Sequence, residues 1–264
     1  MKDKLLIAIP CYNCEKQVQR VLKGLVSNLD TLSPRPETIL FIDNGSSDAT
    51  VKKLQILKED LIKNSQDTPL IRIIRNDSNY GLGGSHKIIF HLAVKEDYDW
   101  VTILHGDDQA SISDIAPLTK RAITTHQTTL GSRFLKDSVL QNYQTSRIIG
   151  NRVLNSIFSV VTKETVTDLG SGLNIFKVED LKKLDLLNLP DSFNFNCELL
   201  LELFKKSIKP QYFPITWSEL DQVSNARNFS VAQSMLKSLM RWKFNLKKSP
   251  NLSKSLETYS YKEL

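Results

Sequence analysis

The feature that most constrains the fold is a regular alternation of short apolar runs with segments whose apolar residues recur at helical spacing. Four runs are expected to be strands, at residues 4–9, 38–42, 70–74 and 100–104. Helical patterns lie between them, over residues 15–29, from about 48 to 63, and up to 93. Strands that alternate with helices predict an α/β fold with a mostly parallel central sheet flanked by helices.

The fourth run ends in a polar turn with three charged or titratable side chains: His105, Asp107 and Asp108. In open α/β sheets, ligands bind beyond the carboxyl ends of the strands, so this turn is expected at a ligand site. Oxygen ligands on a sharp turn suit Mg²⁺ or Mn²⁺, which bind through one or two carboxylates and the substrate's phosphates. The alternative is an acidic turn before a helix that Ser111 or Ser113 caps.

The other three predicted strands also end in polar or glycine-containing loops. The first loop offers Pro10, Tyr12 and Asn13, and the Tyr12 ring can stack on a base. In the second loop, Asp43 is an acceptor suited to a ribose hydroxyl or a base N–H. The third loop opens a helix at residues 81–85, and helix N-termini with glycines bind phosphate groups. Together the loops predict a pocket for a nucleoside diphosphate beside a metal-binding carboxylate.

Two arginines in the second half are candidates for binding phosphate. A predicted strand at residues 128–131 leads into Arg133, and a predicted helix at 146–162 carries Arg147 at its start. Guanidinium groups bind phosphate oxygens in a bidentate manner. For either arginine, the alternative is an ion pair on a solvated face.

The length of 264 residues allows one large domain, or one domain with a small appendage. No run approaches the ~20 apolar residues of a membrane span, and the N-terminus lacks the order of a signal peptide. We therefore expect a cytoplasmic protein, and the alternative is a peripheral position on the inner face of the plasma membrane.

Cys11 and Cys14 form a C-x-x-C that could be a redox pair, but small half-buried residues are the favoured interpretation.

The net charge of +6 is concentrated near the C-terminus. Seven Lys and Arg residues and no acid lie between Asp221 and Glu257, so the rest of the chain is close to neutral. Apolar residues recur there at helical spacing: Val231, Met235, Leu236, Leu239 and Met240. We therefore divide the chain into residues 1–228 and a basic amphipathic C-terminal helix and tail at 229–264. Membrane contact through 231–248 is favoured, and docking on the body or on a second copy, as a homodimer, is the alternative. Nucleic acid is not expected as a partner, because no binding module accompanies the basic run.

The motifs at the ends of these strands resemble glycosyltransferase family 2 over about residues 4–225. The resemblance rests on seven stretches in order: Pro10-Cys11-Tyr12-Asn13, Asp43 to Thr50, the Asn79/Gly81/Gly84 loop, His105-Gly106-Asp107, Gly131-Ser132-Arg133-Phe134, Asp168 with Gly172, and Phe193 to Glu198. They are similar to the branch of dolichyl-phosphate mannose synthase and bacterial polyprenyl-phosphate glycosyltransferases. The resemblance implies a GT-A (Rossmann-like) fold, a nucleotide-sugar donor, a divalent metal, and inversion at the anomeric carbon.

The same resemblance implies roles for individual residues. Binding of the donor would involve Pro10, Tyr12, Asn13, Asp43, Gly81, Gly84, Asp107 and Arg147. Asp107 would bind the metal, and His105 stands where the family usually has the first Asp of D-x-D. Arg133 would stabilise the leaving group, and Asp168 and Glu198 are candidates for base or acceptor positioning. For Asp168 the alternative is a helix cap or a turn.

The chain departs from the family pattern at several positions. Asn44 replaces the second Asp of the usual pair in the second loop, Cys14 moves Glu15 one place late, and Leu220 stands where an Arg is common. We expect an inverting glycosyltransferase that moves a sugar from a UDP-sugar or GDP-mannose to a polyprenyl-phosphate or lipid-linked glycan in cell-surface polysaccharide synthesis. The departures at His105 and Asn44 motivate the alternative, a catalytically silent sugar-nucleotide-binding subunit.

Overall fold

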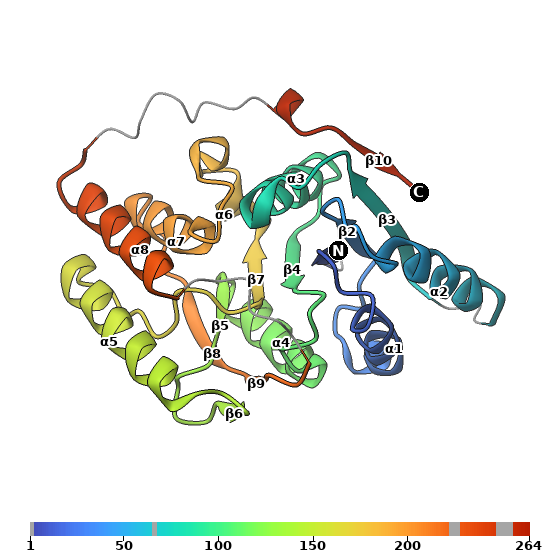
Figure 1. Cartoon of the computed structure of the whole chain (residues 1–264), viewed down its shortest axis with the longest axis horizontal. Coiled ribbons are helices and arrows are strands. Elements are labelled where there is room, and N and C mark those ends of the chain that lie inside the picture. The colour runs from blue at the N-terminus through green and yellow to red at the C-terminus, as the bar shows by residue number, and fades with distance from the viewer. Residues whose placement is uncertain (1–2, 65–67, 222–227, 247–255) are drawn as a thin grey trace.

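A computed structural model describes residues 3–64, 68–221, 228–246 and 256–264 of the chain. Its centre is an eight-stranded sheet in the order β10-β3-β2-β1-β4-β7-β5-β8 (Figure 1). The strands are β1 (Leu5–Cys11), β2 (Thr38–Asp43), β3 (Leu70–Asn76), β4 (Trp100–Leu104), β5 (Thr129–Ser132), β7 (Leu173–Lys177), β8 (Gln211–Pro214) and β10 (Tyr261–Glu263). A second sheet pairs β6 (Val139–Gln141) with β9 (Thr216–Ser218) in parallel.

The sheet is mixed but mostly parallel. β1 pairs in parallel with both β2 and β4, β2 with β3, and β5 with β8. β7 runs antiparallel to β4 and β5, and β10 runs antiparallel to β3. Because the chain goes outward from β1 to β3 and then returns to place β4 on the other side of β1, the strand order reverses between β1 and β4. Ligands of open α/β sheets bind at such a reversal.

Helices cover both faces of the sheet and make it the middle of three layers (Figure 1). One face packs against α1 (Val18–Asn28), α2 (Thr50–Asn64) and α4 (Ile115–Thr125). The other packs against α3 (Gly81–Lys95), α5 (Thr145–Thr162), α6 (Val178–Leu181), α7 (Phe195–Lys205) and α8 (Asn228–Lys243). Strand β1 supplies both cores, since Leu5, Ile7 and Ile9 face the first layer while Leu6 and Ala8 face the second. This double burial explains why its sequence is a continuous apolar run.

The predicted α/β fold is confirmed, and the four predicted strands and the first predicted helix differ from the structure only at their ends. The first strand continues to Cys11, past the proline where we expected it to end, because Pro10 and Cys11 still pair with Ile42 and Asp43 of β2. The third strand likewise continues from the expected residue 74 to Asn76. Helix α1 starts at Val18, three residues later than expected.

The C-terminal helix forms as predicted, and one of its faces docks on the body. Leu239 is buried in the core on the side of α5 and α7, and the Trp242 indole N–H donates to the Leu201 carbonyl at 2.9 Å. The division at residue 228 stays a prediction, and residues 247–248 of the predicted membrane segment lie outside the described part of the chain. Within the described ranges, no helix has the length and hydropathy needed to cross a membrane.

Candidate functional site

A cavity of about 1270 Å³ opens at the carboxyl ends of β1 and β4, where the strand order reverses. Its walls come from the loops after β1, β2 and β4, from the start of α3, and from α5 and α8. Of the residues predicted to form the site, those that line it are Pro10, Tyr12, Asn13, Gly81, His105, Asp107, Arg133, Arg147 and Asp168. The structure thus brings together side chains that are up to about 160 positions apart in the sequence.

The turn after β4 is fixed by backbone contacts to its neighbours. The His105 N–H donates to the Gly172 carbonyl at 2.9 Å, and the Gly106 N–H donates to the Pro10 carbonyl at 3.0 Å. A side chain at residue 106 would not fit, because a Cβ there would lie 2.5 Å from the Cys11 sulfur. The chain therefore needs glycine between the imidazole and the carboxylate so that the turn can lie against the end of β1.

Burial shifts the pKa of both titratable side chains in this turn. It lowers the pKa of His105 to about 4, with the nearby Arg133 charge acting in the same direction, so the imidazole is neutral near pH 7. Burial raises the pKa of Asp107 to about 6, and the neighbouring Asp108 adds to the rise. Such a carboxyl is ionised at neutral pH, and a cation would strengthen the ionised form further.

The donor set fits a divalent cation that is held mainly by a substrate's phosphates. Asp107 supplies a carboxylate, and His105 adds a neutral imidazole whose buried Nε2 has no hydrogen-bond partner among the described residues. Within those residues, no three His, Cys, Asp or Glu side chains gather closely enough to hold a metal by themselves. Mg²⁺ and Mn²⁺ commonly bind in this way, through one or two protein ligands and substrate phosphates.

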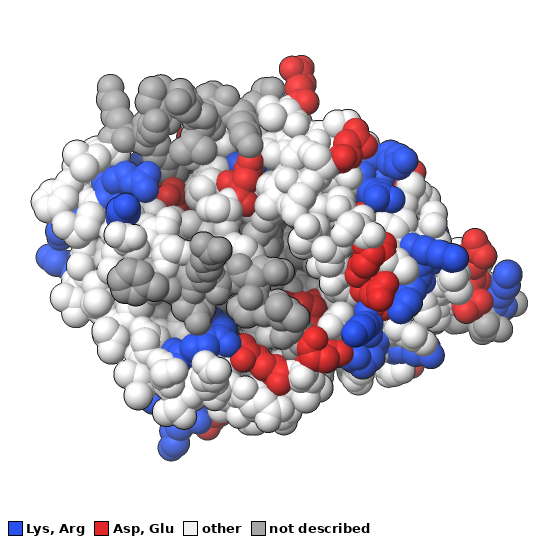
Figure 2. Space-filling model, in the orientation of Figure 1, with Lys and Arg blue, Asp and Glu red and all other residues white. Residues whose placement is uncertain are grey.

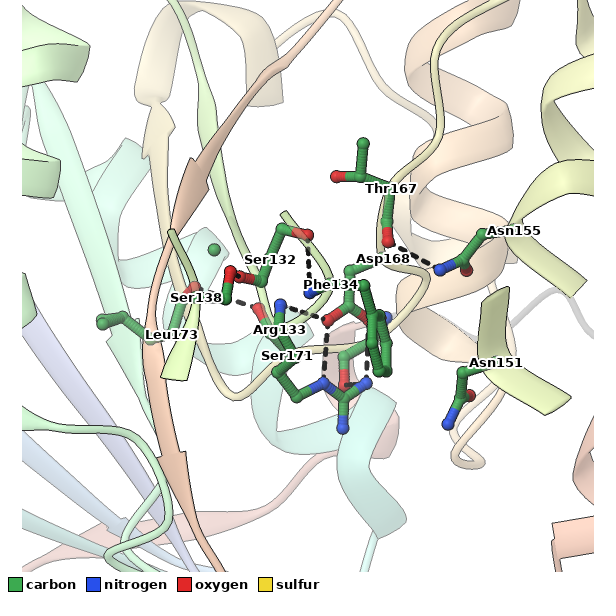
Figure 3. Close-up of polar contacts among 12 residues, drawn as sticks. Ser132, Arg133, Phe134, Ser138, Asn151, Asn155, Thr167, Asp168, Ser171 and Leu173 are labelled. Carbon is green, nitrogen blue, oxygen red and sulfur yellow. Dashed lines mark hydrogen bonds and ion pairs between the residues drawn. The ribbon is translucent and has the colours of Figure 1, made fainter. Parts of the chain in front are cut away.

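Arg133 and Asp168 form a buried ion pair on the wall of the cavity (Figure 3). The Arg133 Nε donates to Asp168 Oδ2 and its Nη2 donates to Oδ1, both at 2.8 Å. The backbone N–H groups of Arg133 and Gly170 also donate to the carboxylate, at 3.0 Å each. Although burial lowers the pKa of Arg133, the charge and hydrogen bonds of Asp168 raise it above the usual range. Asp168 is therefore saturated with donors, and it fixes the guanidinium in one orientation.

Aromatic rings and a second ion pair complete this wall. The Arg133 guanidinium lies 4.9 Å from the centroid of the Trp217 ring, which limits its movement further. Arg147 of α5 lies 4.4 Å from the centroid of the Tyr143 ring, and its Nη1 donates to both carboxylate oxygens of Glu219. Both predicted arginines thus line the cavity and also make the ion pairs that were the alternative interpretation.

The loops after β1 and β2 hold each other in place around the exposed Tyr12 ring. Asn13 has a positive φ of 50°, and its Oδ1 accepts the Ser47 N–H at 2.9 Å. Glu15 accepts the Ala49 N–H at 2.9 Å, which gives this carboxylate a structural partner despite its shifted position in the motif. Tyr12 is 44% exposed and lines the cavity, so its ring is accessible to a planar ligand.

Asn44 organises the loop at the start of α3. Its Nδ2 donates to the Asn79 Oδ1 at 2.8 Å and to the Gly81 carbonyl at 3.2 Å. Its Oδ1 accepts from the Asn76 side chain and from the Tyr80 N–H, both at 2.9 Å. A carboxylate could not donate, so an amide is required at residue 44 in this loop, whatever the family's usual residue.

Three predicted site residues do not line the cavity. Asp43 is fully buried beneath its own loop, where it accepts the Ser46 N–H and lies 3.5 Å from the Arg75 side chain. Gly84 packs under Tyr80 within α3. Glu198 accepts a hydrogen bond from Ser238 of α8 at 2.8 Å. The functional roles assigned to these residues stay predictions.

Sequence reasoning missed several residues that hold the site together. Arg20 of α1 donates to Asp108 at 2.6 Å and to both oxygens of Asp221, so it ties the acidic turn to the segment after β9. The buried Lys87 ammonium bonds to Asp191, close to the start of α3. No spacing rule connects these partners, because 88 and 104 positions separate them along the chain.

Cys11 and Cys14 are both buried free thiols that line the cavity. Their burial agrees with the favoured interpretation as small packing residues. The pKa of Cys11 is raised by its hydrogen bond with Cys14 and by burial, which is the opposite of what a reactive thiol requires.

Comparison with known proteins gives the same family as the motifs. The model of glycosyl transferase family 2 matches residues 6–185, which is more than half of the chain. Dolichyl-phosphate beta-glucosyltransferase of Saccharomyces cerevisiae is 25% identical over 237 residues, covering 82% of this chain and 67% of the yeast protein.

Two solved structures share the fold at low sequence identity. Glucosyl-3-phosphoglycerate synthase of Mycobacterium tuberculosis, solved with Mn²⁺, UDP-glucose and phosphoglyceric acid, is similar with a TM-score of 0.63 at 12% identity, covering 94% of this chain and 82% of that one. The mannosyltransferase PcManGT of Pyrobaculum calidifontis, solved with GDP-mannose and Mn²⁺, gives a TM-score of 0.56 at 14% identity, covering 97% of this chain and 68% of that one. Motifs, family model and architecture agree, and the chain belongs to glycosyl transferase family 2.

Proposed function

We propose that this enzyme is an inverting glycosyltransferase that moves a sugar from a nucleotide-sugar to a polyprenyl-phosphate or lipid-linked glycan acceptor. The observation that carries the proposal is a single cavity with polar groups on one side and apolar groups on the other. Asp107, Tyr12 and the start of α3 line it on the side of the parallel strands, whereas Leu154 of α5 and Met235 of α8 contribute apolar surface. One cavity therefore offers polar groups for a nucleotide and apolar groups for a lipid.

On the donor side, the chain's own groups suit a nucleoside diphosphate. The Tyr12 ring can stack on the base, and the N-terminus of α3 at Gly81 presents backbone N–H groups and the positive end of a helix to phosphate. Asp107, with His105 beside it, would hold the Mg²⁺ or Mn²⁺. When bound, such a cation neutralises charge that develops on the leaving diphosphate.

On the acceptor side, a phosphate oxyanion would attack the anomeric carbon. A bond forms from that oxygen to the carbon, the bond to the donor's diphosphate breaks, and the nucleoside diphosphate leaves with the electron pair. A phosphate monoester is already ionised near pH 7, so this attack needs no general base. Asp168 suits such a reaction as a positioning residue, because its carboxylate accepts two hydrogen bonds from the Arg133 guanidinium and two from backbone N–H groups, and so holds the guanidinium at the cavity wall.

Several finer features belong to the same proposal. The donor nucleoside is uridine or guanosine, the product enters cell-surface polysaccharide synthesis, and the site faces the cytoplasm. Support for the lipid-phosphate acceptor comes from the yeast relative, whose name specifies dolichyl phosphate. The departure at Asn44 was one of the two reasons for considering a silent subunit. It now has a structural explanation, because the Asn44 side-chain N–H group donates hydrogen bonds that the family's usual carboxylate could not donate.

The direct test is transfer of labelled glucose or mannose from UDP-glucose or GDP-mannose to a dispersed short-chain polyprenyl phosphate, with Mn²⁺. We expect a glycosyl phospholipid from the wild type and a loss of at least about 100-fold with Asp107→Asn, since the carboxylate would hold the cation that neutralises charge on the leaving diphosphate. The control is Asp97→Asn, which makes the same change in an exposed turn far from the cavity. Donor hydrolysis without lipid product would refute the acceptor, and neither reaction with a folded protein would support the silent subunit.

A further inference from the structure

Helix α5 has an apolar stripe on its outward side. Its inward side buries Leu154 and Phe158 in the core. On the other side, four aliphatic residues recur at intervals of four, four and three: Ile149, Val153, Ile157 and Val160. Their exposed fractions range from 38% to 78%, and at this spacing they form one stripe along the helix.

Helix α8 packs beside α5 and repeats the pattern (Figure 1). Its inward side is fixed by Ser238 and Leu239, which are buried. Leu236 and Met240 remain exposed, and Phe244 follows the helix with 62% of its surface exposed. Two adjacent helices therefore each leave large apolar side chains uncovered, and contiguous apolar surface of this kind marks an interaction site.

The charges on these helices select the kind of partner. Neither α5 nor α8 contains an Asp or Glu, whereas Arg152, Lys237 and Lys243 are exposed on them. In Figure 2 the described surface on the side of α5 is mostly uncharged, with a few Lys and Arg side chains near it. Apolar and cationic side chains without acids match a surface of anionic lipid. A second copy would bring like charges together, which disfavours a symmetric dimer through this face.

The position of this face relative to the cavity supports the same partner. Gly150 and Leu154 of α5 line the cavity, as do Val231 and Met235 of α8. The same two helices thus border the active-site cavity and carry the exposed apolar residues. A molecule resting on a bilayer through this face would meet a lipid-linked acceptor without lifting it into water.

We propose that the outward face of α5 and α8, formed by Ile149, Val153, Ile157, Val160, Leu236 and Met240, lies on an anionic lipid surface. This face extends beyond the C-terminal segment that the sequence indicated, because its main stripe is on α5. The inference rests on the proposed function, because contact with a membrane would bring the enzyme to its lipid-linked acceptor. The evidence for the face, however, does not depend on which donor the enzyme uses.

The test is flotation of the full chain with vesicles of phosphatidylcholine containing phosphatidylglycerol, compared with phosphatidylcholine alone. The variant Ile149→Gln/Val153→Gln/Val160→Gln removes the stripe at exposed positions, so the fold should persist. Its matched control is Ile56→Gln/Ile62→Gln, which changes exposed isoleucines of α2 on another side of the molecule. We expect wild type and control to float with anionic vesicles, and the α5 variant to bind at least about tenfold more weakly.

Two results would overturn the proposal. One is equal flotation of the α5 variant and the wild type, and the other is no flotation of the wild type. If the wild type instead elutes as a dimer that the α5 variant breaks, a second copy covers the face. Sugar transfer to a detergent-dispersed acceptor distinguishes the proposed enzymatic function from the proposed membrane contact. The α5 variant should retain this transfer, because a dispersed acceptor does not require binding to a bilayer. Flotation without transfer would refute the proposed function alone.

Discussion

At the residue scale, the chemistry of the site depends on the protonation of Asp107. Its pKa of about 6 exceeds the usual value of 3.8 because the carboxyl is buried beside Asp108. A metal or a donor–metal complex needs the ionised form. We therefore predict that metal-dependent donor binding weakens as the pH falls below about 6, and that titration calorimetry with Mn²⁺ and donor across this range will show it. Affinity that stays constant down to about pH 5 would contradict the assigned pKa.

The same shift predicts the pH dependence of stability without ligand. Because the folded protein binds the Asp107 proton more tightly than the unfolded chain, this group stabilises the fold fully below pH 3.8. That contribution is lost as the pH rises from there through about 6. The Asp107→Asn variant should lack this pH-dependent component. As the pH rises from 3.8 to about 6, the Tm of the wild type should therefore fall relative to the Tm of the variant. A constant difference would argue against a buried carboxyl.

Asp168 and Arg133 give a further prediction at this scale. Breaking a buried, bidentate ion pair costs about 3–5 kcal/mol. We expect Asp168→Asn to lower the free energy of unfolding by roughly that amount and to slow transfer, while the acid limb of the pH–rate profile stays where it is. Denaturant unfolding and the pH profile of transfer to a lipid phosphate would check this. If the acid limb disappears in the variant, Asp168 is the general base.

Asn44 gives another prediction, because its hydrogen bonds explain its departure from the family pattern. Asn44→Asp replaces a donor by a charged acceptor facing the Asn79 Oδ1 and the Gly81 carbonyl. We expect a loss of about 1–3 kcal/mol in stability and a higher KM for the donor, because the start of α3 is no longer held. Stability and KM equal to those of the wild type would show that this network does not position the loop.

Motif spacing located these residues in the sequence, but it could not assign their partners. Asn44 and Asn79 are 35 positions apart, and Arg133 and Asp168 are also 35 apart. Each pair meets because the loops that carry its two residues lie at the same edge of the sheet. The sequence therefore indicated which residue types gather at the cavity, whereas the choice between phosphate contact and ion pair required the fold.

At the element scale, the contact between α7 and α8 decides how Glu198 should be interpreted. Glu198 lies in the first turn of α7, and Ser238 of α8 donates to it at 2.8 Å. We predict that Glu198→Gln keeps transfer within about threefold of the wild type. It should lower the free energy of unfolding by only about 1 kcal/mol, because the amide oxygen still accepts the hydrogen bond from Ser238. Ser238→Ala should lower stability similarly. A loss of about 100-fold in kcat for Glu198→Gln alone would instead support the catalytic role predicted from the motif.

The elements that the sequence predicted well are those with long, regular patterns. Helix α5 was expected over residues 146–162 and spans Thr145–Thr162, and β4 was found from its apolar run. The strands β7 and β10 were not assigned. β7 follows a glycine-rich segment and runs antiparallel between β4 and β5, while β10 has three exposed residues and gains its partner only at the edge of β3. Periodicity does not reveal a strand whose pairing is set by distant neighbours.

At the scale of the whole molecule, the reversal of strand order between β1 and β4 places the site. It brings the loop after β1 against the turn after β4, and the Gly106 N–H bonded to the Pro10 carbonyl fixes that contact. The alternation of strands and helices predicted this edge. The positions of α5 and α8 were not predictable in the same way, because these helices begin at residues 145 and 228, 83 positions apart, and no motif links them.

The proposed function depends on the binding of a nucleotide-sugar in the cavity together with a divalent metal at Asp107. Its most direct test is the thermal shift of the wild type and Asp107→Asn with UDP-sugars or GDP-mannose, each with and without Mn²⁺. We predict that one nucleotide class raises the Tm of the wild type in a Mn²⁺-dependent way, since a ligand that binds only the folded state stabilises it by mass action. The variant should lose the metal-dependent part of the shift. No shift with any donor, or an equal shift in both proteins, would contradict the account.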